Sequence, residues 1–238
     1  MATEEKFAIH AAARDGRVTV VESLLNANPK LAKQKDDDGR LPLHWACSYN
    51  HAEIVNLLVN LKDFDPDVQD DMGWTPLMIS ASVKESDKVV DLLLARGADV
   101  NQTNNNGQTV LHFLASKSNL DLARKLLEEI KPPASARVRD KRGQYPIHRA
   151  AAVGSAPMIN LLLKHRSPLN ATDNAGYTAL HHAVAEGHGD VAITLIKAGA
   201  ETDKKDSDGF LALQLAPGPD VRKYIARKAE EEGIEIAM

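Results

Sequence analysis

The chain has 238 residues, of which 43% are hydrophobic and only 4% aromatic, and its formal net charge is −4. This apolar content is enough for a sizeable core, which must be mainly aliphatic. A slightly acidic chain has no overall attraction to nucleic acid or to an anionic membrane surface, so we expect neither as a partner.

The start of the chain and its cysteine content predict where the protein works. Residues Met1–Lys6 lack the basic-then-apolar layout of a secretory signal, and no stretch approaches the roughly 18 apolar residues of a membrane span. The single cysteine, Cys47, excludes an intramolecular disulfide and favours a reducing compartment. We therefore expect a cytoplasmic protein, with the nucleus as a second candidate compartment.

The strongest signal in the chain is an internal repeat. Glycine recurs at intervals of 34, 34, 36, 33 and 33 residues, at Gly39, Gly73, Gly107, Gly143, Gly176 and Gly209. A similar phrase follows each glycine, and a degenerate copy lies at Ala8–His10. The spacing predicts about seven repeats in a single domain, residues 1–238, with approximate boundaries 5–37, 38–71, 72–105, 106–141, 142–174, 175–207 and 208–238.

Within each repeat the residues predict a turn followed by two helices. The glycines end Asp- and Asn-rich turns such as 36–39 and 104–107, where a positive φ is needed. Proline or a capping threonine marks the start of the first helices, at Pro42, Thr75, Pro76, Thr109, Pro146 and Thr178. The second helices carry broad apolar stripes at helical spacing, for example over 54–59, 89–94 and 158–163.

One repeat cannot bury its apolar stripe alone, so the repeats must stack. The predicted fold class is all-α, a solenoid of about seven helix-turn-helix repeats with β-turn fingers. Lys131–Ser135 interrupt the period and indicate a longer loop, and the last repeat passes through Pro217–Pro219 into a charged helix from Asp220 to Glu232.

The phrase after the glycines resembles a known family. Trp74-Thr75-Pro76-Leu77 and Gly39-Arg40-Leu41-Pro42-Leu43-His44 resemble the Thr-Pro-Leu-His-x-Ala signature of ankyrin repeats, which have a period near 33 residues. The resemblance covers nearly the whole chain. It implies that the equivalent histidines brace the turns and serve as scaffold residues, at His10, His44, His112, His148 and His181.

The histidines and the cysteine are interpreted as structural residues, not as catalytic or metal-binding ones. A translational repeat spreads equivalent histidines apart, and the local cluster His181, His182 and His188 lacks a cysteine or a clear carboxylate partner, so we expect no metal. Cys47 is expected to be a small buried residue, not a nucleophile. No phosphate-binding or dinucleotide-binding glycine motif occurs, so we expect neither cofactor nor enzyme activity. The basic run Arg137–Arg142 is interpreted as a solvated fingertip, with nuclear import as the alternative.

With no catalytic or metal site expected, the exposed surface of the stack is the candidate for function. In such a stack the residues beside the turn glycine and along the first helix line one concave face. Six of the ten aromatic residues fall there, namely Trp45, Tyr49, Trp74, Phe113, Tyr177 and Phe210. We expect Trp45 and Trp74 to be exposed as binding anchors, whereas Phe113 and Phe210 are equally consistent with packing between repeats.

Charge on this face is also unevenly distributed. Acidic residues cluster over 36–38 and 63–71, and basic residues over 131–149. The pattern favours a protein partner with the opposite order of charges, although a solvated surface is the alternative. Arg149 is expected to point into the concave face because it follows Pro146-Ile147-His148 in the first helix of its repeat.

A narrower likeness concerns one group of ankyrin proteins. Residues 39–48, 73–77 and 146–152 resemble gankyrin and its fungal counterparts, chaperones for assembly of the proteasome regulatory particle. That resemblance implies that the concave face clamps the C-terminal helical domain of a proteasomal ATPase subunit. The implied contact residues are Asp38, Arg40, Trp45, Asp71, Trp74, Ser82, Lys117, Arg149 and Glu186, and the predicted face adds Arg142, Tyr177 and His182.

The likeness has limits. The animal protein has a Leu-x-Cys-x-Glu peptide proposed to bind retinoblastoma-type pocket proteins, and here those positions read His182-Ala183-Val184-Ala185-Glu186. We therefore do not expect that activity. The alternative function is that of an ankyrin adaptor or inhibitor of a different protein, such as a transcription factor. In either case we expect a chain that is monomeric on its own.

Overall fold

The computed structural model describes residues 7–237. The prediction about Met1–Lys6 therefore lies outside the described residues, as does the start of the first repeat. The chain divides into two compact units, residues 1–105 and 106–238, and each is described by itself. The division coincides with the predicted boundary between the third and fourth repeats, and the single domain over 1–238 stays a prediction.

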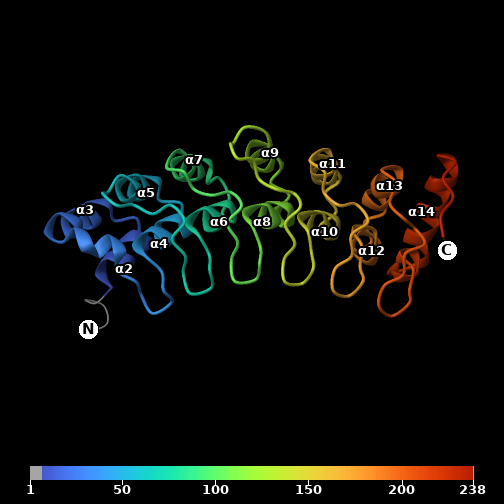
Figure 1. The fold of residues 1–238 in the computed structure, drawn as a ribbon, viewed down its shortest axis with the longest axis horizontal. Helices are drawn as coiled ribbons and strands as arrows, with labels where there is room; N and C mark the ends of the chain where they lie inside the picture. The colour runs from blue at the N-terminus through green and yellow to red at the C-terminus, as the bar shows by residue number, and fades with distance from the viewer. Residues whose placement is uncertain (1–6, 238) are drawn as a thin grey trace. The chain divides into compact units, whose positions relative to one another are not determined.

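The first unit consists of helix pairs in two layers. Its elements are α2 (Ala8–Arg14), α3 (Val18–Ala27), η1 (Pro29–Lys33), α4 (Pro42–Ser48), α5 (Ala52–Val59), α6 (Pro76–Ala81) and α7 (Asp87–Ala95). The first helices α2, α4 and α6 contact one another in sequence, and the second helices α3, α5 and α7 do the same. Figure 1 shows this unit in blue to green, with its finger loops extending beyond the layer of first helices.

The second unit repeats this arrangement. Its elements are α8 (Val110–Lys117), α9 (Leu120–Glu128), α10 (Pro146–Ala152), α11 (Ala156–Lys164), α12 (Ala179–Ala185), α13 (Gly189–Lys197), η2 (Ala212–Leu215) and α14 (Pro219–Glu231). The first helices α8, α10 and α12 form one layer that continues into η2, and α9, α11, α13 and α14 form the other (Figure 1). The predicted all-helical fold is confirmed.

The last repeat departs from the predicted pair of helices. Its first helix is the four-residue 3₁₀ turn η2, because Pro217 and Pro219 follow within four residues and proline cannot continue a helix. The charged helix α14 begins at Pro219, one residue earlier than predicted, and ends at Glu231. Among residues 7–237, no helix is both long enough and apolar enough to span a membrane.

The second helices bury the predicted apolar stripes. In α5, Ile54 and Val55 are fully buried, and in α7 Val89, Val90 and Leu93 are fully buried. These side chains recur at three- and four-residue spacing, so one face of each helix packs against its neighbours while the other faces solvent. The core of each unit is accordingly aliphatic.

The fingers form as the turn residues predict. Pro42, Pro76 and Pro146 are the first residues of α4, α6 and α10. Backbone hydrogen bonds join successive fingers within each unit: Asp71 N to Asp38 O, Asn105 N to Met72 O, Lys141 N to Asn106 O, Asn174 N to Arg142 O and Ser207 N to Ala175 O. Each finger is thereby held to the next by its own main chain.

Three of the five equivalent histidines, His44, His112 and His148, brace the turns through both ring nitrogens, whereas His10 Nδ1 and His181 Nε2 are buried without a hydrogen-bond partner among the described residues. His148 Nδ1 accepts a hydrogen bond from Tyr145 N over 3.0 Å, and its Nε2 lies 3.0 Å from the Ala171 carbonyl, two residues before the next finger aspartate, Asp173. His44 and His112 make the same pair of contacts. Burial disfavours the charged imidazolium and lowers the pKa of His112 and of His148 to about 4. These side chains are therefore neutral scaffold groups at pH 7.

Candidate protein-binding surface

An aspartate three residues before the turn glycine organises most fingers. Asp70 Oδ1 accepts hydrogen bonds from the backbone N–H groups of Met72 (3.0 Å) and Trp74 (2.8 Å). The same two bonds, to the residues two and four positions later, are made by Asp36, Asp140, Asp173 and Asp206. One carboxylate oxygen thus holds the turn, and the other is left to bind a side chain.

The second oxygen of these carboxylates fixes side chains on the predicted binding face. Asp36 Oδ2 accepts from Trp45 Nε1 over 2.7 Å, and Asp140 Oδ2 accepts from Arg149 Nη2 over 2.9 Å. Asp173 Oδ2 lies 2.9 Å from His182 Nε2. In all three cases the partner is nine residues further along, on the first helix. The finger carboxylate therefore sets the orientation of a residue that sequence reasoning assigned to partner binding.

Arg40 and Trp45 form one cluster in the first unit. Arg40 Nε donates to Asp70 Oδ2 over 3.1 Å, and its guanidinium carbon lies 5.2 Å from the centre of the Trp45 ring. Burial opposes ionisation of Asp36, but the hydrogen bonds from Trp45 and from the Arg40 and Asp38 amides outweigh it and lower the pKa of this carboxyl. The cluster is consequently charged and positioned before any partner arrives.

The other predicted residues of the first unit differ in exposure. Asp38 and Asp71 are exposed on successive fingertips, and Trp74 is half-buried at the base of its finger. Ser82 caps the end of α6 and its hydroxyl donates to Met78 O over 3.0 Å. Of this group, the two fingertip carboxylates have the greatest access to a partner.

Arg149 lies on α10 in the second unit. Its side chain is 23% exposed and is paired with Asp140, whose side chain is 2% exposed. One of its terminal nitrogens thus binds a buried carboxylate of its own chain, and its contact with a partner stays a prediction. Arg142, on the fingertip, and Lys117, at the end of α8, are exposed.

Tyr177, His182 and Glu186 lie in the sixth predicted repeat, 175–207, in and beside α12 of the second unit. The Tyr177 ring lies 5.5 Å from that of His182 in an edge arrangement, and Asp173 holds His182 from the other side. Glu186 is exposed at the end of α12. The structure thus brings Tyr177 and His182 into direct contact, whereas Glu186 stands apart from that contact.

The aromatic residues are partly more buried than expected. Trp45 and Trp74 were predicted to be exposed, but both are half-buried. The Trp45 ring is hydrogen-bonded to Asp36 and lies beside the Arg40 guanidinium. Phe113 is half-buried, whereas Phe210 is 50% exposed and Tyr49 is 53% exposed, so packing between repeats does not cover Phe210. The exposed aromatic surface is therefore placed differently from the prediction.

Fewer charged residues are exposed on this face than the sequence suggests. Asp70 is 6% exposed and belongs to the interior of its finger. Asp37, Asp38 and Asp71 remain exposed in the first unit, and Arg137, Arg139, Lys141 and Arg142 remain exposed in the second. The fingertips of the first unit are thus acidic, whereas in the second unit the fingertip at Lys141 and Arg142 is basic, the one at Asn174 and Ala175 is neutral and the last one carries the exposed Asp208.

The finger aspartates are the functional positions that the sequence reasoning missed. It treated Asp36 and Asp70 as surface charge, whereas they organise the side chains of the candidate surface. A signal was present: aspartate occurs three residues before the turn glycine in five of the six fingers, with Asn104 in the sixth.

The described part of the chain holds no group of three or more histidine, cysteine, aspartate or glutamate residues placed to bind a metal ion. Cys47 is fully buried, and burial raises the pKa of its thiol to about 12, so it is a packing residue at neutral pH. Stacked helix pairs whose fingers present fixed aromatic and charged side chains define a protein-interaction module of the repeat type.

The comparisons with known proteins agree with this class. A family model described as "Ankyrin repeats (3 copies)" matches residues 2–70, 59–135 and 130–206, and the chain belongs to the ankyrin-repeat family. It is 40% identical over 164 residues to a Saccharomyces cerevisiae protein named "Probable 26S proteasome regulatory subunit p28". The aligned residues cover 66% of this chain and 68% of the relative. The resemblance predicted from the sequence is confirmed.

A second relative and two solved structures are also similar to this chain. The Schizosaccharomyces pombe "Ankyrin repeat-containing protein C6C3.08" is 40% identical over 156 residues, 65% of this chain and 66% of the relative. The ankyrin repeat domain of Bcl-3 has a TM-score of 0.73 at 26% identity, covering 92% of this chain and 97% of that one. The human ASB11 ankyrin repeat domain, at 20% identity and a TM-score of 0.79, covers 92% of this chain and 96% of its own, and shows the fold alone.

Proposed function

We propose that the chain is a protein-binding chaperone that holds the C-terminal helical domain of a proteasomal ATPase subunit and assists assembly of the proteasome regulatory particle. The observation that carries the proposal is the 40% identity to the yeast relative named as a probable 26S proteasome regulatory subunit, over about two thirds of both chains. The proposal extends that relative's named role to this chain.

The geometry of the fingers supports a protein partner. Arg40, Trp45 and His182 are each held by a finger carboxylate. Side chains ordered before binding lose little conformational entropy when a partner docks, which favours affinity. Exposed acidic fingertips in the first unit and the basic fingertip at Lys141 and Arg142 in the second provide complementary contacts for a helical domain with both signs of charge.

The proposed mechanism is steric. While the chaperone covers the C-terminal domain of one ATPase subunit, the ATPase ring is hindered from docking on the core particle. Release then permits docking once the regulatory particle is correctly assembled. No chemical step is needed, so the activity depends on binding and dissociation alone.

The test uses purified chain and the isolated C-terminal domains of the proteasomal ATPase subunits of the same organism, measured by isothermal titration calorimetry. We expect one domain to bind. Asp71→Lys and Arg142→Glu change exposed fingertip residues that form no ion pair with another residue of 7–237, and each should weaken binding by about 1 kcal/mol. Trp74→Ala should weaken it by about 1–3 kcal/mol.

Matched controls carry the same charge changes on the second helices. Glu53→Lys lies on α5 and Arg124→Glu on α9, and both positions are exposed. These variants should bind with unchanged affinity. If no ATPase domain binds, or if the controls weaken binding as much as the fingertip variants, the proposal is wrong. Capture of a transcription factor from native extract in place of proteasome subunits would favour the adaptor alternative.

A further inference from the structure

The first unit contains a cavity that does not involve the candidate protein-binding surface. It has a volume of about 450 Å³ and lies between η1, the start of α4, the end of α5 and residues 61–68. Its apolar lining includes Leu41, Leu43, Leu58, Leu61, Phe64 and Val68. This volume falls in the range of small-molecule sites.

The cavity has a cause in the loops that leave the second helices. In the third repeat Val100, four residues before Asn104, is 2% exposed and fills this position. The equivalent residue before Asp36 is Ala32, whose smaller side chain lines the cavity. In the second repeat Asp63, at φ 58°, takes the left-handed position that Gly97, at φ 86°, has in the next repeat, and Phe64, which lines the cavity, stands where the next repeat has the smaller Ala98. The side chains that leave and line the space are therefore those of the first two repeats.

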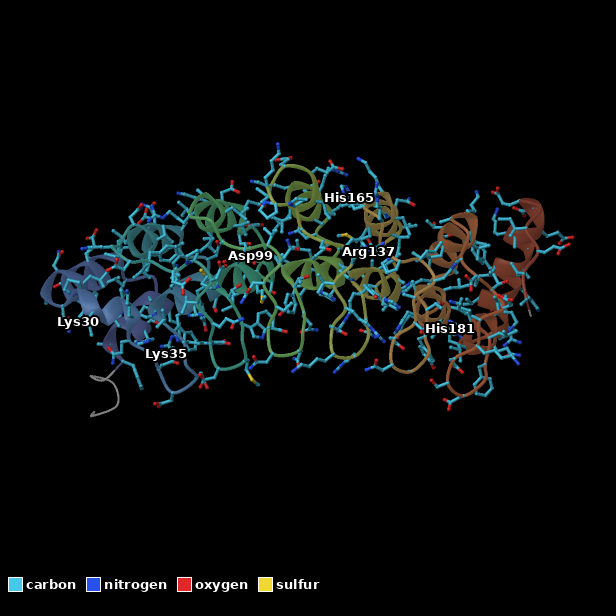
Figure 2. The ribbon with its side chains drawn as sticks, in the orientation of Figure 1. Lys30, Lys35, Asp99, Arg137, His165 and His181 are labelled. Carbon is cyan, nitrogen blue, oxygen red and sulfur yellow. The ribbon has the colours of Figure 1, made fainter. Side chains whose placement is uncertain are left out.

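The entrance carries unpaired positive charge. Lys33, Lys35 and Lys62 line the cavity and are exposed, and none forms an ion pair with a described residue. Figure 2 shows Lys35 on the segment that leads from α3 into the first finger. Two carboxylates, Asp63 and Asp65, also line the cavity, so the three lysines leave one positive charge in excess. Asp65 Oδ1 accepts a hydrogen bond from Asp67 N over 3.0 Å.

A fourth cation lies beside the apolar wall. The Arg96 guanidinium carbon lies 5.8 Å from the centre of the Phe64 ring. An apolar interior with an excess of cations at its entrance matches a ligand that has one apolar body and one anionic group, because each part is then transferred to a favourable environment.

We propose that this cavity binds an amphipathic organic anion, a carboxylate or sulfonate whose hydrocarbon body occupies the space between Leu41, Leu43 and Phe64 and whose charged group lies at Lys33, Lys35 and Lys62. The proposal is independent of the partner proposed above, since neither Trp45 nor any fingertip residue lines the cavity.

The test measures binding of decanoate to the full chain by its displacement of the fluorescent sulfonate 8-anilinonaphthalene-1-sulfonate, with the stoichiometry checked by calorimetry. Decanoate should bind one molecule per chain. Decyltrimethylammonium has a chain of the same length but a cationic head, and it should bind about tenfold more weakly. Equal affinity for the two ligands would show that the cavity does not distinguish an anionic from a cationic head group, which would contradict the proposal. Absence of saturable decanoate binding below about 1 mM would also overturn it.

Two variants locate the site. Ala32→Phe fills the cavity and should weaken decanoate binding about tenfold or more. Lys33→Glu combined with Lys62→Glu reverses the charge at the entrance and should weaken it about fivefold. Lys84→Glu combined with Lys88→Glu makes the same charge change at exposed positions elsewhere in the unit and should leave binding unchanged.

The lysine pair keeps the proposal falsifiable if Ala32→Phe fails to fold, as judged by circular dichroism. Unchanged affinity in the Lys33/Lys62 variant would place the anion elsewhere and refute the site. Binding of the ATPase domain should be the same with and without decanoate, so failure of this proposal and failure of the proposed function are distinguishable.

Discussion

The indole Nε1–H of Trp45 donates a hydrogen bond to Asp36 Oδ2 over 2.7 Å, so a predicted binding anchor also supports its own finger. The same carboxylate holds the turn through its other oxygen. Binding and stability are therefore coupled at this residue, and a loss of affinity on mutation of Trp45 needs a stability control before it is assigned to a lost contact.

Trp45→Phe should reduce the free energy of unfolding by about 1–2 kcal/mol, because the variant keeps an aromatic ring but leaves Asp36 Oδ2 without its donor. Urea denaturation followed by circular dichroism measures this. The same substitution in an Asp36→Ala background should cost less than half as much. Equal costs in the two backgrounds would show that packing of the indole, not the hydrogen bond, supports the finger.

Asp206 lacks the donor that its counterparts have. Its Oδ2 is buried and has no hydrogen-bond partner among residues 7–237, and the residue nine positions later is Leu215 where Asp140 has Arg149 and Asp173 has His182. Leu215→Arg should therefore raise the free energy of unfolding by about 1–2 kcal/mol by supplying a charged donor.

The matched control for this prediction is Leu215→Met, which keeps the size of the side chain without a donor. It should change the stability by less than 1 kcal/mol. If the arginine variant is no more stable than the methionine variant, the equivalence between Leu215 and the donors of the earlier repeats does not hold.

The buried histidines predict a loss of stability in acid. The folded-state pKa of His112 and of His148 is about 4, below the ordinary 6.5, so the unfolded chain binds more protons as the pH falls. Their contribution is complete above about pH 6.5 and is lost between 6.5 and 4. Each should lower the free energy of unfolding by about 1.4 kcal/mol per pH unit in that window. Urea midpoints at pH 7, 6 and 5 measure the slope.

The last repeat suggests a control for this titration. Gln214 occupies the position of these histidines and its Oε1 accepts a hydrogen bond from Leu211 N over 2.9 Å. His112→Gln should therefore keep the brace while removing one titrating group. Its pH slope between 6.5 and 4 should be shallower than that of the original chain, and an unchanged slope would exclude His112 as a source of the acid sensitivity.

Two glycines with positive φ should respond differently to alanine. A Cβ at Gly176 would lie 2.7 Å from the backbone nitrogen of Ser207 in the next finger, whereas a Cβ at Gly199 meets nothing within 4 Å. Both substitutions cost about 1 kcal/mol for the left-handed backbone. Gly176→Ala should cost about 2 kcal/mol more because the fingers must separate. Thermal unfolding of the two variants measures the difference. Equal losses of stability would mean that the contact between the fingers adds no cost to the Gly176 substitution.

Much of the fold follows from local rules, and the sequence predicts it well. Glycine at a positive φ, proline at the first helical position and apolar residues at helical spacing each act within a few residues of the chain. The repeat multiplies these signals about seven times, so even a degenerate copy is placed correctly. The prediction was wrong where two prolines follow a short segment, and η2 replaces a full helix there.

The candidate surface depends more strongly on contacts across repeats. The sequence identified Arg40, Trp45, Arg149 and His182 as residues of one face, but it did not show that finger carboxylates already bind them. It likewise gave no indication of the cavity beside η1, which lies between residues of the first two repeats such as Ala32 and Phe64. Local conformational preference is encoded residue by residue, and the sequence alone therefore determined the repeat, its helices and its turns. Which oxygen meets which donor, and where packing leaves space, depends on atoms brought together from distant positions, and only the tertiary structure decided them.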